Sequence, residues 1–215
     1  MWERQAQLLR LRRYEVVTPD LTGFGTEPVP SEPFSDVERV AAMLPATLVG
    51  NSFGGKVALA TALSHPDQVP RLVLIAPAID GHEWSDEMRE YWRQEAELID
   101  EGALDAAVEL TLEFFAQPEV HETLRPMQRR AYELQVESSV EERWPEEKPF
   151  HRLSMPTLLI VGENDRPDFH AIARRITRDA PSARMEVVSG AKHVPSLESP
   201  EEFERLLLDF LEHGV

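Results

Sequence analysis

The fold is decided by the stretch Leu48-Val49-Gly50-Asn51-Ser52-Phe53-Gly54-Gly55-Lys56-Val57-Ala58. It begins with apolar residues typical of a buried strand and continues with residues suited to a helix packed on a sheet. At the junction, Gly50 and Gly54 flank Ser52 in a Gly-x-Ser-x-Gly pattern. Small residues two before and two after the serine allow strand and helix to pack closely around a strained, exposed serine. The stretch therefore predicts a nucleophile elbow with Ser52 at its tip.

Further short apolar runs lie on both sides of this elbow. Continuous hydrophobicity, as in Leu72-Val73-Leu74-Ile75, is what strands covered on both faces require. Most of the runs are followed by a segment with helical periodicity, so the sequence predicts an α/β fold with a mostly parallel sheet and helices on both faces. The expected strands are Tyr14–Thr18, Ala46–Gly50, Arg71–Ala76, Pro156–Gly162 and Arg184–Val188.

Residues 80–150 interrupt this alternation. Apolar residues keep helical spacing there without an intervening strand, which predicts an insertion of about three helices. The segment Trp144-Pro145-Glu146-Glu147-Lys148-Pro149 is typical of a loop that returns the chain to the sheet. We therefore expect an α/β core from residues 1–79 and 151–215, with a helical cap from residues 80–150.

Composition excludes several functional classes. The 215 residues include 39 Asp and Glu against 22 Lys and Arg, a net charge of −17, which disfavours nucleic acid and anionic membrane surfaces as partners. The absence of Cys removes disulfides, thiolate chemistry and Cys-based metal sites. No apolar run reaches 18 residues, and the residues after Met1 lack the layout of a signal peptide. These features predict a cytoplasmic protein, provided that Met1 is the true N-terminus. No cofactor or metal is expected, because side chains and water are sufficient for the chemistry of a serine nucleophile.

Two further loops carry residues that a serine nucleophile needs. A serine hydroxyl is a weak nucleophile, so it requires a general base, which in turn requires an orienting carboxylate. In this architecture the chain order is Ser, acid, His. Asp165 follows the fourth predicted strand and His193 follows the fifth. Both positions lie at the carboxyl ends of parallel strands, where open α/β sheets hold their sites.

At these residues the chain resembles the α/β-hydrolases, in particular small esterases, lactonases and C–C bond hydrolases with a helical cap. The resemblance covers nearly the whole chain and includes the turn Thr18–Gly25 and the stretch Leu197–Phe203. It implies acyl transfer by Ser52, because relatives that open epoxides or displace halide use an Asp nucleophile. It also implies that the Phe53 backbone N–H is one oxyanion donor.

The assignment of the acid has a rival. Asp80 follows the third predicted strand, the other place where such folds put the acid, and Asp168 is near Asp165. Asp165 fits the loop best, and Asp80 is the alternative. The remaining histidines lack a setting like that of His193 and are expected to be solvated or structural.

The resemblance also implies a second oxyanion donor, from a loop after the family's third strand. Tyr14–Thr18 resembles the family's fourth strand, so about 30 to 50 residues have no counterpart here. The strand Ala46–Gly50 would then have an unpaired edge unless Tyr14–Thr18 moved beside it. Three explanations account for the missing residues. The start is misassigned or truncated, a partner subunit in a homo-oligomer completes the sheet, or the protein is a shortened, weakly active enzyme.

The predicted cap is strongly acidic. Eleven acidic and two basic residues lie between Glu83 and Glu113. A solvated helix face explains them, and the sharper alternative is a lid that disfavours dianionic substrates and favours neutral or cationic ones. Apolar cap residues either belong to a core or line an acyl pocket. They are Trp84, Trp92, Phe114, Phe115 and Met127.

Three functions remain open at this point. The first is a serine hydrolase that cleaves a small carboxylic ester or lactone through an acyl-enzyme on Ser52. The second is a C–C bond hydrolase of a dienoate-type ketone, because Gly50–Gly55 resembles the elbow of that group. The third, from another class, is a binding protein that keeps the hydrolase fold without catalysis.

Overall fold

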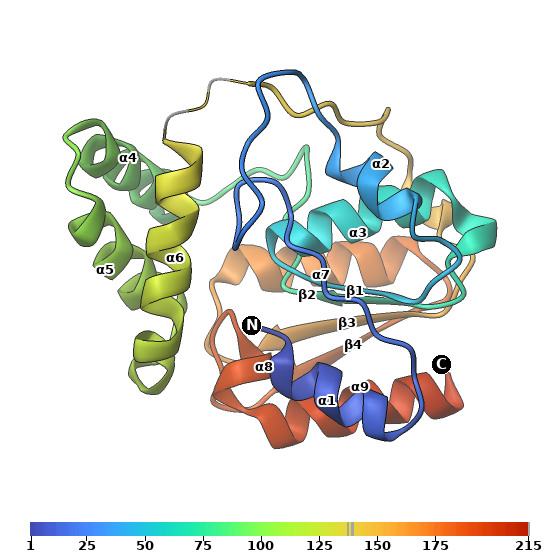
Figure 1. Ribbon diagram of the computed structural model, residues 1–215. Coiled ribbons are helices and arrows are strands. Elements are labelled where there is room, and N and C mark those ends of the chain that lie inside the picture. The colour runs from blue at the N-terminus through green and yellow to red at the C-terminus, as the bar shows by residue number, and fades with distance from the viewer. Residues whose placement is uncertain (137, 139, 215) are drawn as a thin grey trace.

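A four-stranded parallel sheet lies at the centre of the computed structural model, which describes residues 1–136, 138 and 140–214 (Figure 1). The strands follow the order β1-β2-β3-β4, and each pairs in parallel with the next, as Leu48 does with Leu72. The α/β class and four of the expected strands are thus confirmed. Their bounds are β1 (Leu48–Asn51), β2 (Leu72–Ile75), β3 (Thr157–Gly162) and β4 (Ala183–Val188).

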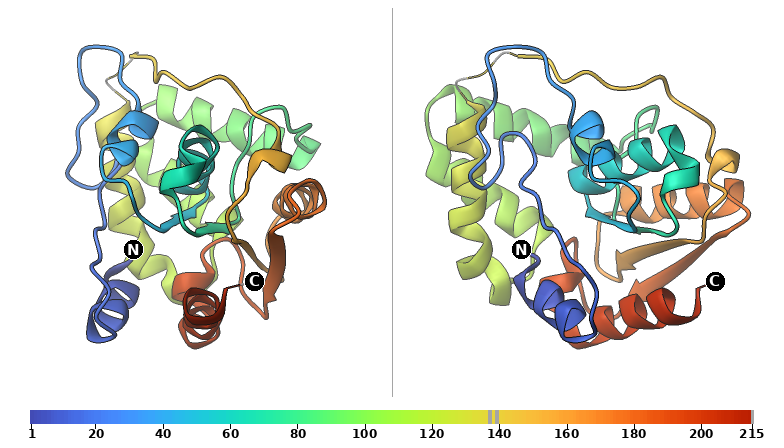
Figure 2. Two further views of the ribbon diagram at one scale, coloured as in Figure 1. Left: turned by 90° about the vertical axis from the view of Figure 1, so that its right-hand side faces the viewer. Right: turned by 45° about the vertical axis from the view of Figure 1, so that its right-hand side comes forward.

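Helices cover both faces of the sheet (Figures 1 and 2). Leu72 and Leu74 of β2 belong to a core shared with the helices of one face, whereas Val73 and Ile75 belong to a second core on the other face. All four side chains are fully buried. Burial of an aliphatic side chain of this size contributes about 1.5–3 kcal/mol. One face carries α2 (Asp36–Ala41), α3 (Phe53–Ser64) and α7 (Pro167–Asp179), and the other carries α1 (Glu3–Leu11), α8 (Pro195–Glu198) and α9 (Pro200–His213).

The predicted strand Tyr14–Thr18 is wrong. The chain leaves α1 through Arg13, which has a φ of 67°, and the Arg10 guanidinium donates to the Val16 carbonyl. Val17 is 66% exposed, so this apolar run does not lie in the core. Strand formation requires a neighbour for its backbone groups, and among the described residues no strand pairs with the outer edge of β1. The sheet therefore has four strands rather than the five expected.

Three helices stand beside the sheet between β2 and β3 in the chain (Figure 2). They pack around a small core of their own that includes Val108, Leu112 and Tyr132. We call these three helices the insertion helices: α4 (Asp86–Asp100), α5 (Leu104–Phe115) and α6 (His121–Gln135).

In the described part of the chain, no helix combines the length and the apolar character that crossing a bilayer requires.

Short 3-10 turns and long connections complete the chain. The connection from α1 to α2 meets the one from α6 to β3 above the sheet, where the Arg143 N–H donates to the Phe34 carbonyl (2.6 Å; Figure 1). The insertion helices lie next to the loops that follow β3 and β4, since Arg166 and His193 each donate to a carbonyl at the end of α5. The 3-10 turns are η1 (Pro66–Gln68), η2 (Pro118–Val120) and η3 (Phe150–Arg152).

Candidate active site

Ser52 lies at a sharp turn between β1 and α3. Its φ of 53° and ψ of −116° are a strained conformation for a residue with a side chain. The turn is held because the Ser52 N–H donates to the Ile75 carbonyl (2.8 Å) while its own carbonyl accepts from the Lys56 N–H (3.0 Å). A Cβ on Gly50 would come within 2.2 Å of the Gly54 carbonyl oxygen. Only glycine therefore allows β1 and α3 to approach this closely, as the sequence pattern predicts.

Asp165 and His193 form a buried pair between the loops that follow β3 and β4. The Asp165 Oδ2 atom lies 2.9 Å from His193 Nδ1, and the side chains are only 1% and 7% exposed. Asp165 Oδ1 accepts from the Arg166 N–H (2.7 Å), which directs Oδ2 toward the imidazole. The Phe115 and Phe169 rings pack against the imidazole, with centroids 4.8 and 4.2 Å away. The carboxylate thus fixes one ring nitrogen and leaves Nε2 for another partner.

The loop of His193 is tied to the elbow through the residue before Ser52. The Asn51 side chain donates from Nδ2 to the His193 carbonyl (3.2 Å), and the His193 N–H donates to the Phe115 carbonyl (3.1 Å). Among the described residues, no hydrogen bond joins Ser52 Oγ to the imidazole. Such bonds are often long in hydrolases without substrate and shorten when one binds.

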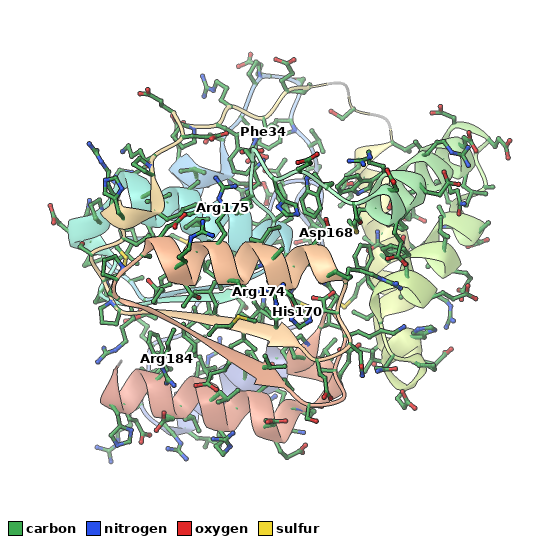
Figure 3. The ribbon with its side chains drawn as sticks, turned by 180° about the vertical axis from the view of Figure 1, so that it is seen from behind. Phe34, Asp168, His170, Arg174, Arg175 and Arg184 are labelled. Carbon is green, nitrogen blue, oxygen red and sulfur yellow. The ribbon has the colours of Figure 1, made fainter. Side chains whose placement is uncertain are left out.

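The rival carboxylates have other partners. Asp80 is half exposed and pairs with Lys56 (2.6 Å). Asp168, at the start of α7 (Figure 3), accepts from the Ser85 N–H (2.8 Å) and hydroxyl (2.6 Å) and contacts His82 (3.1 Å). Burial alone would raise the pKa of Asp168, but these hydrogen bonds outweigh it and lower the pKa. Neither carboxylate contacts His193, so the geometry favours Asp165.

Phe53 is the first residue of α3, where backbone N–H groups have no acceptor within the helix. Its ring lies between those of Phe24 and Trp144, with centroids 5.7 and 6.0 Å away. Phe24 belongs to the turn Thr18–Gly25, which is part of the resemblance noted from the sequence. The neighbouring rings pack against the Phe53 side chain, while its N–H belongs to the free first turn of α3, next to Ser52.

Glu198 is a residue of this site that sequence reasoning missed. Its Oε2 accepts from the N–H groups of Lys192 (2.7 Å) and Val194 (3.3 Å), the two neighbours of His193. Its Oε1 accepts from the Gln117 N–H (2.7 Å), just beyond α5. Burial raises the pKa of Glu198, although these three hydrogen bonds oppose the shift. The sequence held only a weak signal, the place of Glu198 in the stretch Leu197–Phe203.

Four of the five apolar insertion residues considered for an acyl pocket belong to one aromatic cluster beside His193. The ring of Phe169 joins the two halves of this cluster, with centroids 5.7 Å from Trp84 and 6.2 Å from Phe115. Trp92 packs on Trp84, and Phe114 packs on Phe115. Met127 is 40% exposed. A cavity of about 340 Å³ has none of these residues in its wall and lies along α3 beneath the segment from Trp144 to His151.

Comparison with known proteins adds the family context. The model of a family described as "Alpha/beta hydrolase family" matches residues 1–206. The 2-hydroxymuconate semialdehyde hydrolase of Pseudomonas putida is 28% identical over 216 residues, covering 91% of this chain and 76% of that protein. The pimeloyl-[acyl-carrier protein] methyl ester esterase of Chromobacterium violaceum is 27% identical over 227 residues, covering 93% and 85%.

Solved structures share the fold. An esterase from Exiguobacterium antarcticum superposes with a TM-score of 0.78 at 19% identity, covering 98% of this chain and 86% of that one. The enol-lactonase from Burkholderia xenovorans superposes with a TM-score of 0.76 at 21% identity, covering 99% and 86%. At these identities the likeness concerns the arrangement of the chain.

Proposed function

Because this chain belongs to the alpha/beta hydrolase family, we propose that it is a serine hydrolase that cleaves a small carboxylic ester or lactone. The observation that carries the proposal is the buried Asp165–His193 pair, tied through Asn51 to the strained turn of Ser52. A nucleophile, a base and an orienting carboxylate on three neighbouring loops are the parts that acyl transfer requires.

The proposed reaction has two halves. Ser52 Oγ attacks the carbonyl carbon while His193 Nε2 accepts its proton, and the Phe53 N–H stabilises the negative oxygen that forms. When the carbon–oxygen bond of the ester breaks, His193 returns the proton to the leaving alkoxide. Water then gives a proton to His193 and attacks the acyl-enzyme, and Ser52 recovers its proton as the acid leaves. Asp165 keeps the imidazole in the tautomer that allows both transfers.

We also propose that residues 80–150 act as a cap over this site. The end of α5 supports this proposal, since its Phe115 carbonyl accepts from the His193 N–H and its Phe114 carbonyl accepts from Arg166 (2.6 Å). A substrate bound between the cap and Ser52 would be shielded from water, which strengthens the electrostatic interactions of the site.

Hydrolysis of p-nitrophenyl acetate and butyrate, compared with that of a ring-fission dienoate, tests the proposed substrate class. We expect turnover of the esters to exceed that of the dienoate. Robust activity on the dienoate alone would favour the second candidate, a C–C bond hydrolase. That candidate is supported by the Gly50–Gly55 stretch and by relatives such as the Pseudomonas putida hydrolase.

We propose that Glu198 positions His193, and replacement of Glu198 tests this role. In Glu198→Gln an amide N–H₂ takes the place of one acceptor oxygen, so the bonds to Lys192 and Val194 or the bond to Gln117 are lost. Displacement of a catalytic group by about 1 Å costs about 100-fold in rate, so we expect kcat for p-nitrophenyl butyrate to fall 10- to 100-fold with KM little changed.

The matched control is Glu202→Gln. Glu202 accepts from the Ser189 N–H of the same loop (3.2 Å) but does not flank His193. Its replacement should change kcat less than about twofold, because it leaves the neighbours of His193 bound. Rates measured well below each variant's melting temperature separate positioning from stability. Equal kcat in wild type and Glu198→Gln would contradict the assigned role.

A further inference from the structure

Glu95 differs from most acidic residues of the insertion helices in its partners. Six of the eleven acidic residues between Glu83 and Glu113 pair with arginine on the surface. In the described part of the chain, Glu95 has no ion-pair partner and instead binds hydroxyl groups. The six paired residues are Asp86, Glu87, Glu90, Glu97, Asp105 and Glu109.

The hydroxyl groups around Glu95 come from all three insertion helices. Tyr91 of α4 donates to Glu95 Oε1 (2.5 Å), Tyr132 of α6 donates to the same oxygen, and Thr111 of α5 lies 3.5 Å from it. Burial raises the pKa of both phenols, and the negative charge of Glu95 raises it further. The phenols therefore remain protonated donors at neutral pH. Among the described residues, no protein group donates to Oε2, so this oxygen is available to a ligand.

A cavity of about 270 Å³ opens beside Glu95. Its wall includes the aromatic residues Phe24 and Tyr132 and the amide residues Gln128 and Gln135. Glu95 is the one charged residue in this described wall. Since ligand pockets usually measure about 300–1,000 Å³, the cavity suits one small head group rather than a whole substrate. A carboxylate and an aromatic residue in the wall of one cavity are an arrangement that attracts an organic cation.

One residue of the cavity wall, Phe24, contacts the nucleophile elbow. Phe24 stacks on Phe53, the residue after Ser52, with ring centroids 5.7 Å apart and planes inclined by 26°. Gln135 fixes the turn that carries Phe24 by donating to the Gly23 carbonyl (3.0 Å). A substrate extending from Ser52 past Phe53 and Phe24 would reach the cavity of Glu95.

We propose that this cavity binds an alkylammonium group of the substrate, with Glu95 as its counter-ion. The proposal rests on the proposed function, since it takes Ser52 as the nucleophile of the same substrate. The ammonium group would lie against Phe24 while Glu95 Oε2 balances its charge. The exposed, arginine-paired acids of the insertion helices contribute no such site, because their charges are compensated and solvated.

Two isosteric esters test the proposal. In p-nitrophenyl 4-(trimethylammonio)butyrate a quaternary nitrogen stands where p-nitrophenyl 5,5-dimethylhexanoate has a quaternary carbon, so the pair differs essentially in charge. We expect the wild-type kcat/KM to be about tenfold higher for the cationic ester, the scale of one carboxylate and one aromatic contact at a partly exposed site. Glu95→Gln should remove this preference by slowing the cationic ester alone.

Glu97→Gln is the matched control. It removes the same charge from the same helix, but Glu97 is 60% exposed and pairs with Arg93. This variant should keep the tenfold preference. The wild-type ratio tests the proposal even if Glu95→Gln does not fold, since equal kcat/KM for the two esters in an active wild-type enzyme would overturn it.

Binding of tetramethylammonium, followed by saturation-transfer NMR, provides a readout that requires no catalysis. We expect binding to Ser52→Ala protein and its loss in the Ser52→Ala, Glu95→Gln double variant. No binding, or binding unaffected by Glu95→Gln in folded protein, would overturn the site. An inactive chain that still binds tetramethylammonium through Glu95 would instead refute the proposed hydrolase function and leave the cation site standing.

Discussion

Asp165→Asn is expected to lower kcat for p-nitrophenyl butyrate about 10⁴-fold with little change in folding. An asparagine at this position keeps the shape of the side chain but presents an amide to His193 Nδ1, which favours the wrong tautomer of the imidazole. The contact in question is the 2.9 Å hydrogen bond between two side chains that are almost fully buried. Steady-state kinetics with melting temperature as the folding check measure the effect.

Asp80→Asn is the matched control for this prediction. Asp80 pairs with Lys56 at the surface, and its side chain is 48% exposed. An exposed ion pair of this kind contributes about 0–1 kcal/mol to the free energy of unfolding, so the variant should fold. Because Asp80 pairs with Lys56 rather than with His193, we expect kcat within about twofold of wild type. A large loss in Asp80→Asn together with a small one in Asp165→Asn would exchange the roles of the two acids.

Gly50→Ala is expected to reduce the free energy of unfolding by more than about 3 kcal/mol. The added Cβ would lie 2.2 Å from the Gly54 carbonyl oxygen and 2.5 Å from its carbon, atoms of the first turn of α3 that cannot move without displacing the helix. Overpacking against flexible side chains costs about 1–3 kcal/mol, and backbone atoms yield less readily. Urea unfolding followed by circular dichroism measures the loss.

Gly54→Ala separates this steric effect from the general effect of replacing glycine. The nearest heavy atom to a Cβ at Gly54 is Leu21 Cδ1 at 3.8 Å, an ordinary contact. Alanine favours helix by up to about 1 kcal/mol relative to glycine, so stability should be unchanged or slightly higher. Equal stability of Gly50→Ala and Gly54→Ala would contradict the close approach of β1 to α3.

The parts of the fold that follow from local pattern were predictable. The runs around Val73 and Leu159 are continuously apolar because both faces of their strands are covered, and such runs identify buried strands directly. Tyr14–Thr18 contains the β-branched pair Val16 and Val17 but has no neighbouring strand, and pairing is a property of the whole sheet that one segment does not encode. A strand prediction from composition alone therefore failed at the edge of the sheet.

The candidate site likewise contains residues that could be predicted from the sequence and residues that could not. Asp165 and His193 follow strand ends in the chain order expected after Ser52, so their pairing could be expected from the topology. The proposed roles of Glu198 and Glu95 depend on hydrogen bonds to other elements, such as that of Glu198 with Gln117 and that of Glu95 with Tyr132. Contacts of this kind arise from the packing of helices, which leaves no periodic mark in the sequence.

Reaction with a fluorophosphonate probe tests the central claim most directly, because the probe forms a covalent bond only with an activated serine. Intact-protein and peptide mass spectrometry should find one adduct, located on Ser52, in wild-type protein and none in Ser52→Ala. Labelling should also slow strongly in His193→Ala, since the base that activates Ser52 is then absent. Well-folded wild-type protein without an adduct, or with an adduct on another residue, would contradict the assignment of Ser52 as the nucleophile and favour a binding protein with a hydrolase fold.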